Sequence, residues 1–137
     1  MLTALVAAVA REPVNLWLLL AAINGFLAVA CGAFAAHGLQ GRLDAPALQI
    51  FETAARYQMY HALALGLSAF AMRGPAAPAA QVSGAFFLAG IVLFSGSLYL
   101  LALTGARAFA FVTPFGGAAF LVGWIALAFA ATRLAAQ

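Results

Sequence analysis

The residues of this chain that could do chemistry gather at the start of one apolar segment. Glu52 and Arg56 are four residues apart, and Tyr57, Gln58 and His61 follow before the sequence becomes apolar. A helix places Glu52 and Arg56 on one face, where we expect an ion pair. The same helix points His61 roughly 180° away from Glu52. A carboxylate and imidazole dyad within this helix is therefore excluded.

A partner for His61 must come from another helix, and the third apolar segment offers hydroxyl groups at comparable depth. The expected candidate polar pocket consists of Tyr57, Gln58, His61, Ser95, Ser97 and Tyr99. His61 could be a hydrogen-bonded packing residue there, or it could handle protons or contact a ligand. A Ser-His hydrolase is a poor fit because no third carboxylate lies on the same side of the helix.

The sequence lacks the residues that other reaction classes require. It has no Gly-rich phosphate loop, no paired carboxylates and no HExxH helix. No spacing of cysteine and histidine matches a zinc site. We therefore assign no catalytic residue, no metal and no cofactor, and we do not expect an enzyme.

The composition identifies the environment of these residues. Of the 137 residues, 67% are hydrophobic and only 7% are charged, which is typical of an integral membrane protein. The net charge of +3 is small and scattered, so nucleic acid is excluded as a partner and membrane lipids are favoured. Because a span needs about 20 residues, the length suits one bundle of about four spans.

Apolar segments predict an all-α integral membrane fold in a single domain, residues 1–137. The four predicted spans cover residues 16–36, 52–72, 82–103 and 114–131. The second helix, capped by Asp44, would measure roughly 39 Å over residues 47–72, so its first two turns should lie among lipid headgroups. A short interfacial helix is expected over residues 1–10, before Pro13.

An even number of spans places both termini on one side of the membrane. Arg11, Arg73 and Arg133 lie on that side, and the positive-inside rule then favours cytoplasmic termini. Because most of the polar side chains lie toward the opposite side, we expect a shallow pocket rather than a site at the midplane. The default location is a bacterial inner membrane.

Small residues on two of the helices predict close helix contacts. Asn24, Gly25 and Gly32 fall within one arc of the first span, and Gly116 and Gly123 share an arc of the fourth. Glycine allows two helix backbones to approach closely in lipid. In the small-residue stripe of the first span, Asn24 is expected to form a hydrogen bond to another helix.

Four ordered motifs match a known family over nearly the whole chain. They are GAFAAHGL at residues 32–39, YQMYHALA at 57–64, FSGSLY at 94–99 and TPFGG at 113–117, which continues to Gly123 and Trp124. With them the chain resembles the YgdD-like family, bacterial relatives of transmembrane protein 256. The resemblance implies a small four-span membrane protein of unknown function. Ala35 stands where the family commonly has glycine.

The sequence is compatible with three functions. The first is a non-enzymatic helical bundle that acts by association with itself, with lipid or with a larger membrane complex. The second is a small transporter or channel with its polar pocket around His61, working as a homo-oligomer. The third, a lipid-modifying enzyme with His61 as base, has the least support.

Overall fold

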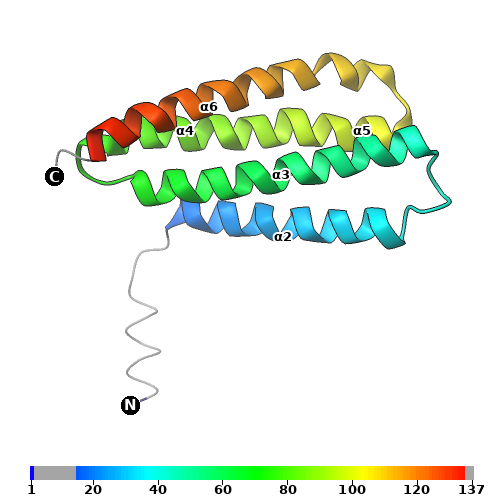
Figure 1. Cartoon of the computed structure of the whole chain (residues 1–137), viewed down its shortest axis with the longest axis horizontal. Helices are drawn as coiled ribbons and strands as arrows, with labels where there is room; N and C mark the ends of the chain where they lie inside the picture. The colour runs from blue at the N-terminus through cyan, green and yellow to red at the C-terminus, as the bar shows by residue number, and fades with distance from the viewer. Residues whose placement is uncertain (2–14, 135–137) are drawn as a thin grey trace.

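A computed structural model describes Met1 and residues 15–134 of the chain. The expected interfacial helix over residues 1–10 lies almost entirely outside the described residues. The described elements are α2 (Leu16–His37), α3 (Ala45–Ala71), η1 (Gly74–Ala76), α4 (Ala77–Gly90), η2 (Ile91–Ser95), α5 (Gly96–Thr104), η3 (Arg107–Phe111) and α6 (Thr113–Leu134). The long helices run side by side, and the start of α2 and the end of α6 lie at the same end of the bundle (Figure 1).

Polar residues begin the first two long helices. The Asn15 side chain accepts a hydrogen bond from the Leu18 backbone N–H at 3.1 Å, and Asp44 accepts one from Ala47 at 2.9 Å. Each side chain pairs with a backbone donor that has no partner within the helix. The predicted Asp44 cap is therefore confirmed, and α3 begins immediately after it.

The described helices fit a membrane. Three stretches, Leu16–His37, Gly74–Thr104 and Arg107–Leu134, are long and apolar enough to cross it. The remaining long helix, α3, is more polar because it carries Glu52, Arg56, Gln58 and His61. The all-helical membrane fold expected from composition is confirmed, with three helices that meet the requirements of a span.

The third apolar segment differs from the expectation in two ways. Its α-helix begins at Ala77 rather than near residue 82, because Pro78 is tolerated in a first turn where no backbone N–H is needed. The helix then widens into a π turn, η2, in which the Gly96 N–H bonds to the carbonyl of Ile91, five residues back. The sequence motifs gave no sign of this turn.

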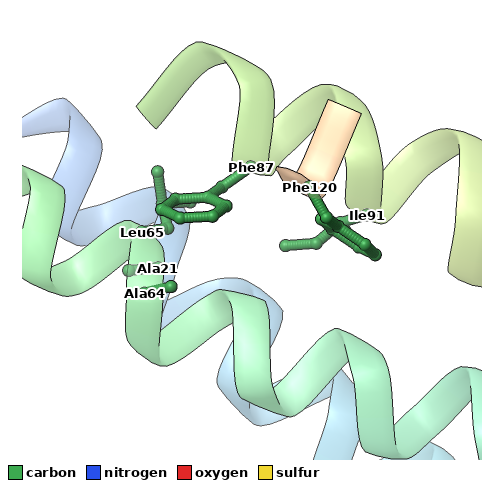
Figure 2. Close-up of a cluster of buried hydrophobic side chains, with 6 residues drawn as sticks. All are labelled: Ala21, Ala64, Leu65, Phe87, Ile91 and Phe120. Atoms are coloured by element: carbon green, nitrogen blue, oxygen red, sulfur yellow. The ribbon is translucent and has the colours of Figure 1, made fainter. Parts of the chain in front are cut away.

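One core cluster lies where α2, α3, α4, η2 and α6 meet. Figure 2 shows its buried side chains, which are Ala21, Ala64, Leu65, Phe87, Ile91 and Phe120. Gly123 allows α6 to approach this cluster, since a Cβ there would lie 2.7 Å from Cδ1 of Phe87. A Cβ at Gly116 would collide with the backbone of Phe94 in η2. Both glycines of α6 are thus placed at close contacts within the chain.

The glycines of α2 differ from those of α6. A Cβ at Gly25 or Gly32 would meet nothing within 4 Å. The face that α2 buries consists instead of Ala21, Asn24, Ala28 and Ala35. Gly25 and Gly32 therefore lie on the flank of this contact, and close packing of another helix against them stays a prediction.

Candidate functional site

The structure divides the predicted polar pocket among three places. Gln58, Ser95 and Tyr99 line a cleft between α2, α3 and the segment formed by η2 and α5. Tyr57 and His61 line an aromatic groove between α3 and α6. Ser97 lies outside both, and its hydroxyl is 2.7 Å from that of Thr113 at the start of α6. The six residues therefore do not form one pocket.

A chain of hydrogen bonds joins three helices beside the cleft. The Tyr99 hydroxyl donates to Oε1 of Gln58 at 2.8 Å, and Nε2 of Gln58 donates to Oδ1 of Asn24 at 3.1 Å. Nδ2 of Asn24 donates in turn to the Leu20 carbonyl at 2.9 Å. Asn24, predicted to bond across helices, does so. The side-chain amides of Gln58 and Asn24 each have a second N–H that takes no part in these bonds.

The hydrogen-bonded chain joins residues near the middle of two long helices. Gln58 stands at the middle of the 27-residue α3, and Asn24 lies near the middle of the 22-residue α2. The charged Arg56 is two residues from Gln58, about 3 Å along the axis of α3. The expectation of a shallow pocket stays a prediction.

Ser95 has an unusual environment. Its side chain is 1% exposed, and Oγ is a buried polar atom without a hydrogen-bond partner among the described residues. Elsewhere in the helices, Ser68 and Thr104 bond to the carbonyl four residues earlier. For Ser95 that carbonyl belongs to Ile91, which accepts from the Gly96 N–H in the π turn. The Ser95 hydroxyl makes no such bond, and the residue lies within the π turn.

We call the cavity beside these residues the Ser95 cleft. It has a volume of about 370 Å³ and is lined by Asn24, Leu27, Cys31, Gln58, Ile91, Val92, Ser95, Gly96 and Tyr99. No charged side chain is among them. Leu27 is 44% and Val92 63% exposed, so they form an apolar mouth toward the surroundings of the bundle. The cleft can therefore offer hydrogen bonds to an uncharged group at membrane depth.

His61 has partners that differ from those expected. Nε1 of Trp124 lies 3.3 Å from Nε2 of His61, and the His61 ring stacks on Phe120 with centroids 3.4 Å apart. Because an indole nitrogen can only donate, Nε2 accepts and Nδ1 carries the proton toward the Tyr57 carbonyl, 2.8 Å away. The expected partners Ser95, Ser97 and Tyr99 were wrong. Sequence reasoning placed Trp124 in a motif without linking it to His61.

Glu52 and Arg56 do not form the expected ion pair. No salt bridge joins these two described residues, of which Glu52 is half-buried and Arg56 exposed. Exposed pairs gain only about 0–1 kcal/mol, too little to hold two flexible side chains together. They therefore lie in the N-terminal half of α3 as separate charges.

A third polar contact was not anticipated from the sequence. The hydroxyl groups of Ser68 and Ser83 are 2.9 Å apart, and Ser83 donates to the Gly123 carbonyl at 2.9 Å. This network links α3, α4 and α6, and both serines are fully buried. Nothing distinguishes these serines in the sequence, because each is a single small polar residue within an apolar run.

Similarity to known proteins places the chain in a family. Residues 31–117 match a family model described as a protein of unknown function (DUF423). The chain is 43% identical over 120 residues to the UPF0382 membrane protein YwdK of Bacillus subtilis, covering 87% of this chain and 98% of YwdK. The chain belongs to the UPF0382 family. This family membership confirms the resemblance that the four motifs indicated.

Further relatives cover most of this UPF0382 member. It is 45% identical over 117 residues to the inner membrane protein YgdD of Escherichia coli, covering 85% of this chain and 89% of YgdD. A membrane protein of Haemophilus influenzae is 47% identical over 116 residues, with 84% and 92% covered. No solved structure matches the chain. It is thus a membrane protein of a family whose function is unknown.

Proposed function

We propose that this UPF0382 protein is a non-enzymatic membrane protein that binds a lipid-soluble molecule in the Ser95 cleft. The observation that carries the proposal is the Ser95 hydroxyl, which is buried without a partner beside the cleft. An unsatisfied buried hydroxyl costs about 1–3 kcal/mol of stability. A bound molecule that pairs with it would recover that free energy.

The arrangement of the cleft supports a ligand that enters from lipid. Its mouth is formed by exposed apolar side chains, and the polar groups of Gln58 and Tyr99 lie on its lining. Ligand sites commonly combine mostly apolar walls with a few placed polar groups. The volume of about 370 Å³ suits the polar part of a lipid-soluble molecule, with its apolar part extending into the bilayer.

The state of His61 supports binding rather than catalysis. Its two ring nitrogens are engaged by the Tyr57 carbonyl and by Trp124. A general base needs a free lone pair within reach of a substrate proton. In this arrangement the lone pair of Nε2 faces the indole N–H, so we propose that His61 holds α3 against α6.

We further propose four spans, with α3 as the fourth, in the bacterial inner membrane. A helix of 27 residues measures about 40 Å, enough to cross the bilayer with its charged first turns among headgroups. The position of α3 between α2 and the other helices supports the same topology (Figure 1). The name of the Escherichia coli relative supports the inner membrane. Arg73 and Arg133 favour cytoplasmic termini.

Photocrosslinking tests the proposed binding. A photoreactive residue at Leu27, at the mouth of the cleft, should capture a specific molecule in native membranes, and mass spectrometry would identify it. The control position is Ile125 on α6, which is 71% exposed and lies outside the cleft. The proposal fails if both positions give the same adducts in the same proportions, because both would then report bulk lipid.

The open flank of α2 favours a second candidate, self-association. Gly25 and Gly32 lie two turns apart with free space around them, next to an apolar groove of about 470 Å³ between α2 and α3. Small residues in lipid allow helices to approach closely. We propose a second copy as the occupant, because a two-fold axis would place the same glycines of both α2 helices against each other.

A further inference from the structure

We infer that the ligand of the Ser95 cleft is an electrically neutral lipid whose carbonyl oxygen accepts a hydrogen bond from Ser95. This inference rests on the proposed binding function and specifies the chemical class of the ligand. Diacylglycerols and lipid-soluble quinones share this chemistry. Each has a carbonyl group on a small polar head and a long apolar part.

The charge of the lining excludes an ionic head. Every residue that lines the cleft is uncharged, and its polar members are amides, hydroxyls and a thiol. A phosphate or ammonium group at this depth would have no counterion, and an isolated ion in an apolar medium is strongly disfavoured. A neutral head carries no such penalty.

The hydrogen-bonding capacity of the lining favours an acceptor on the ligand. The Ser95 hydroxyl has no bond, while the Gln58 and Asn24 amides each keep one N–H beyond the chain that joins them. Three donors therefore remain uncommitted at the cleft, the Ser95 hydroxyl and one N–H of each amide. A carbonyl oxygen on the ligand can accept a hydrogen bond from them.

The position of the site along α3 agrees with a neutral lipid. Gln58 lies just beyond the charged part of α3 that we place at the headgroups, so the cleft adjoins the hydrocarbon region. A molecule without a charged head can bring its carbonyl group into the hydrocarbon region. Its apolar part would leave the cleft past Leu27 and Val92, which face outward.

The free donor lies within the π turn. In a regular helix the Ser95 hydroxyl would bond to its own backbone, as the hydroxyl of Ser68 does with Ala64. Here the Ile91 carbonyl accepts from the Gly96 N–H, and the Ser95 hydroxyl forms no bond to it. π turns occur frequently at functional sites, and this one contains a free hydroxyl at the wall of a cleft.

Binding of defined lipids to the full-length protein tests the inference. The purified protein in detergent is mixed with dioleoylglycerol, decylubiquinone or dioleoylphosphatidylglycerol, and retained lipid is counted by native mass spectrometry. We expect retention of at least one of the two carbonyl-bearing neutral lipids and not of the anionic lipid. Ser95→Ala should weaken retention about tenfold, as expected for one hydrogen bond. The matched control is Ser97→Ala, whose hydroxyl bonds to Thr113 away from the cleft.

Infrared spectroscopy separates recognition from folding. A 13C-labelled carbonyl on the retained lipid should absorb at lower frequency when bound to the wild type and should lose that shift in Ser95→Ala. Retention of phosphatidylglycerol alone, or equal retention and shift in Ser95→Ala, would overturn the inference and leave the binding function intact. If the wild type retains none of the three lipids and the Leu27 crosslinks match the control, the binding function itself fails.

Discussion

Gln58 connects three helices through its one amide group. It accepts from Tyr99 of α5 and donates to Asn24 of α2, and its side chain is 6% exposed. Both amide atoms are used, so neither partner can be removed without leaving a buried polar atom unpaired. In a membrane, where no water replaces a lost partner, this chain fixes how α2, α3 and α5 rotate against each other.

Loss of the Tyr99 hydroxyl should destabilise the bundle. Tyr99→Phe leaves Oε1 of Gln58 without a donor, and we expect the free energy of unfolding to fall by about 0.5–2 kcal/mol. Reversible unfolding in mixed detergent micelles would measure it. Tyr60→Phe is the matched control, because Tyr60 is 52% exposed and should be neutral. Equal stability of the two variants would contradict a role for the hydrogen-bonded chain.

Sequence reasoning found the residue types of the site but not all of their partners. It selected Gln58, Tyr99 and His61 because placing polar side chains in lipid is unfavourable in free energy. Which of them meet depends on the rotation and depth of each helix, and a helical angle places a side chain only on a face. The contact between Trp124 and His61 was therefore not predicted, because a tryptophan in an apolar helix can also face lipid or the membrane surface.

Helices α4 and α6 fit together through glycines that the sequence pattern selected. Gly116 and Gly123 face η2 and α4, where an added Cβ would meet Phe94 and Phe87. On α2 the glycines lie beside the contact within the chain and not in it. A stripe of small residues indicates that a helix can be approached closely, but it does not tell which neighbour does so.

Adjacent glycines on α6 should respond differently to substitution. Gly116→Ala drives a methyl group into the Phe94 backbone, which cannot move without shifting η2, and should cost about 1–3 kcal/mol. Gly117→Ala meets only side-chain atoms of Phe94 at 3.9 Å or more and should cost nothing. Thermal unfolding of both variants in detergent measures the difference. Equal losses would mean that α6 does not approach η2 as described.

Disulfide crosslinking tests the proposed pairing of α2. In a Cys31→Ala background, Gly32→Cys should form a covalent dimer in oxidised membranes, because two copies of α2 would meet at this position. Ile125→Cys, which is exposed on α6, should stay monomeric. Monomers from both variants would contradict self-association through α2, and so would dimers from both in equal yield.

The whole molecule is best regarded as a bundle in which α3 is the central and least apolar helix. It packs against α2 on one side and against α4 and α5 on the other (Figure 1). Composition and apolar segments predicted the helices themselves, because length and hydropathy suffice for that. The π turn within the third segment was missed, since an added residue per turn leaves no mark on an apolar pattern.

Cysteine labelling should establish whether α3 crosses the membrane. Arg42 and Arg73 are exposed at opposite ends of α3. The test uses a Cys31→Ala background. If the protein has four spans and cytoplasmic termini, an impermeant maleimide should label Arg42→Cys in intact spheroplasts, whereas it should label Arg73→Cys only after lysis. Labelling of both positions from one side would rule out α3 as a span. The reverse pattern would keep the four spans and invert the orientation.

The widened turn at Ile91–Ser95 also acts as a phase shift along the third helical segment. One extra residue in a turn rotates everything after it by about 100° relative to a regular helix. The faces of α4 and α5 are therefore set independently: Phe87 points toward α6, while Tyr99 reaches Gln58. Deletion of a single residue such as Val92 would restore the regular helical rotation and turn Tyr99 away from Gln58. The segment therefore cannot change in length by even one residue without losing this contact.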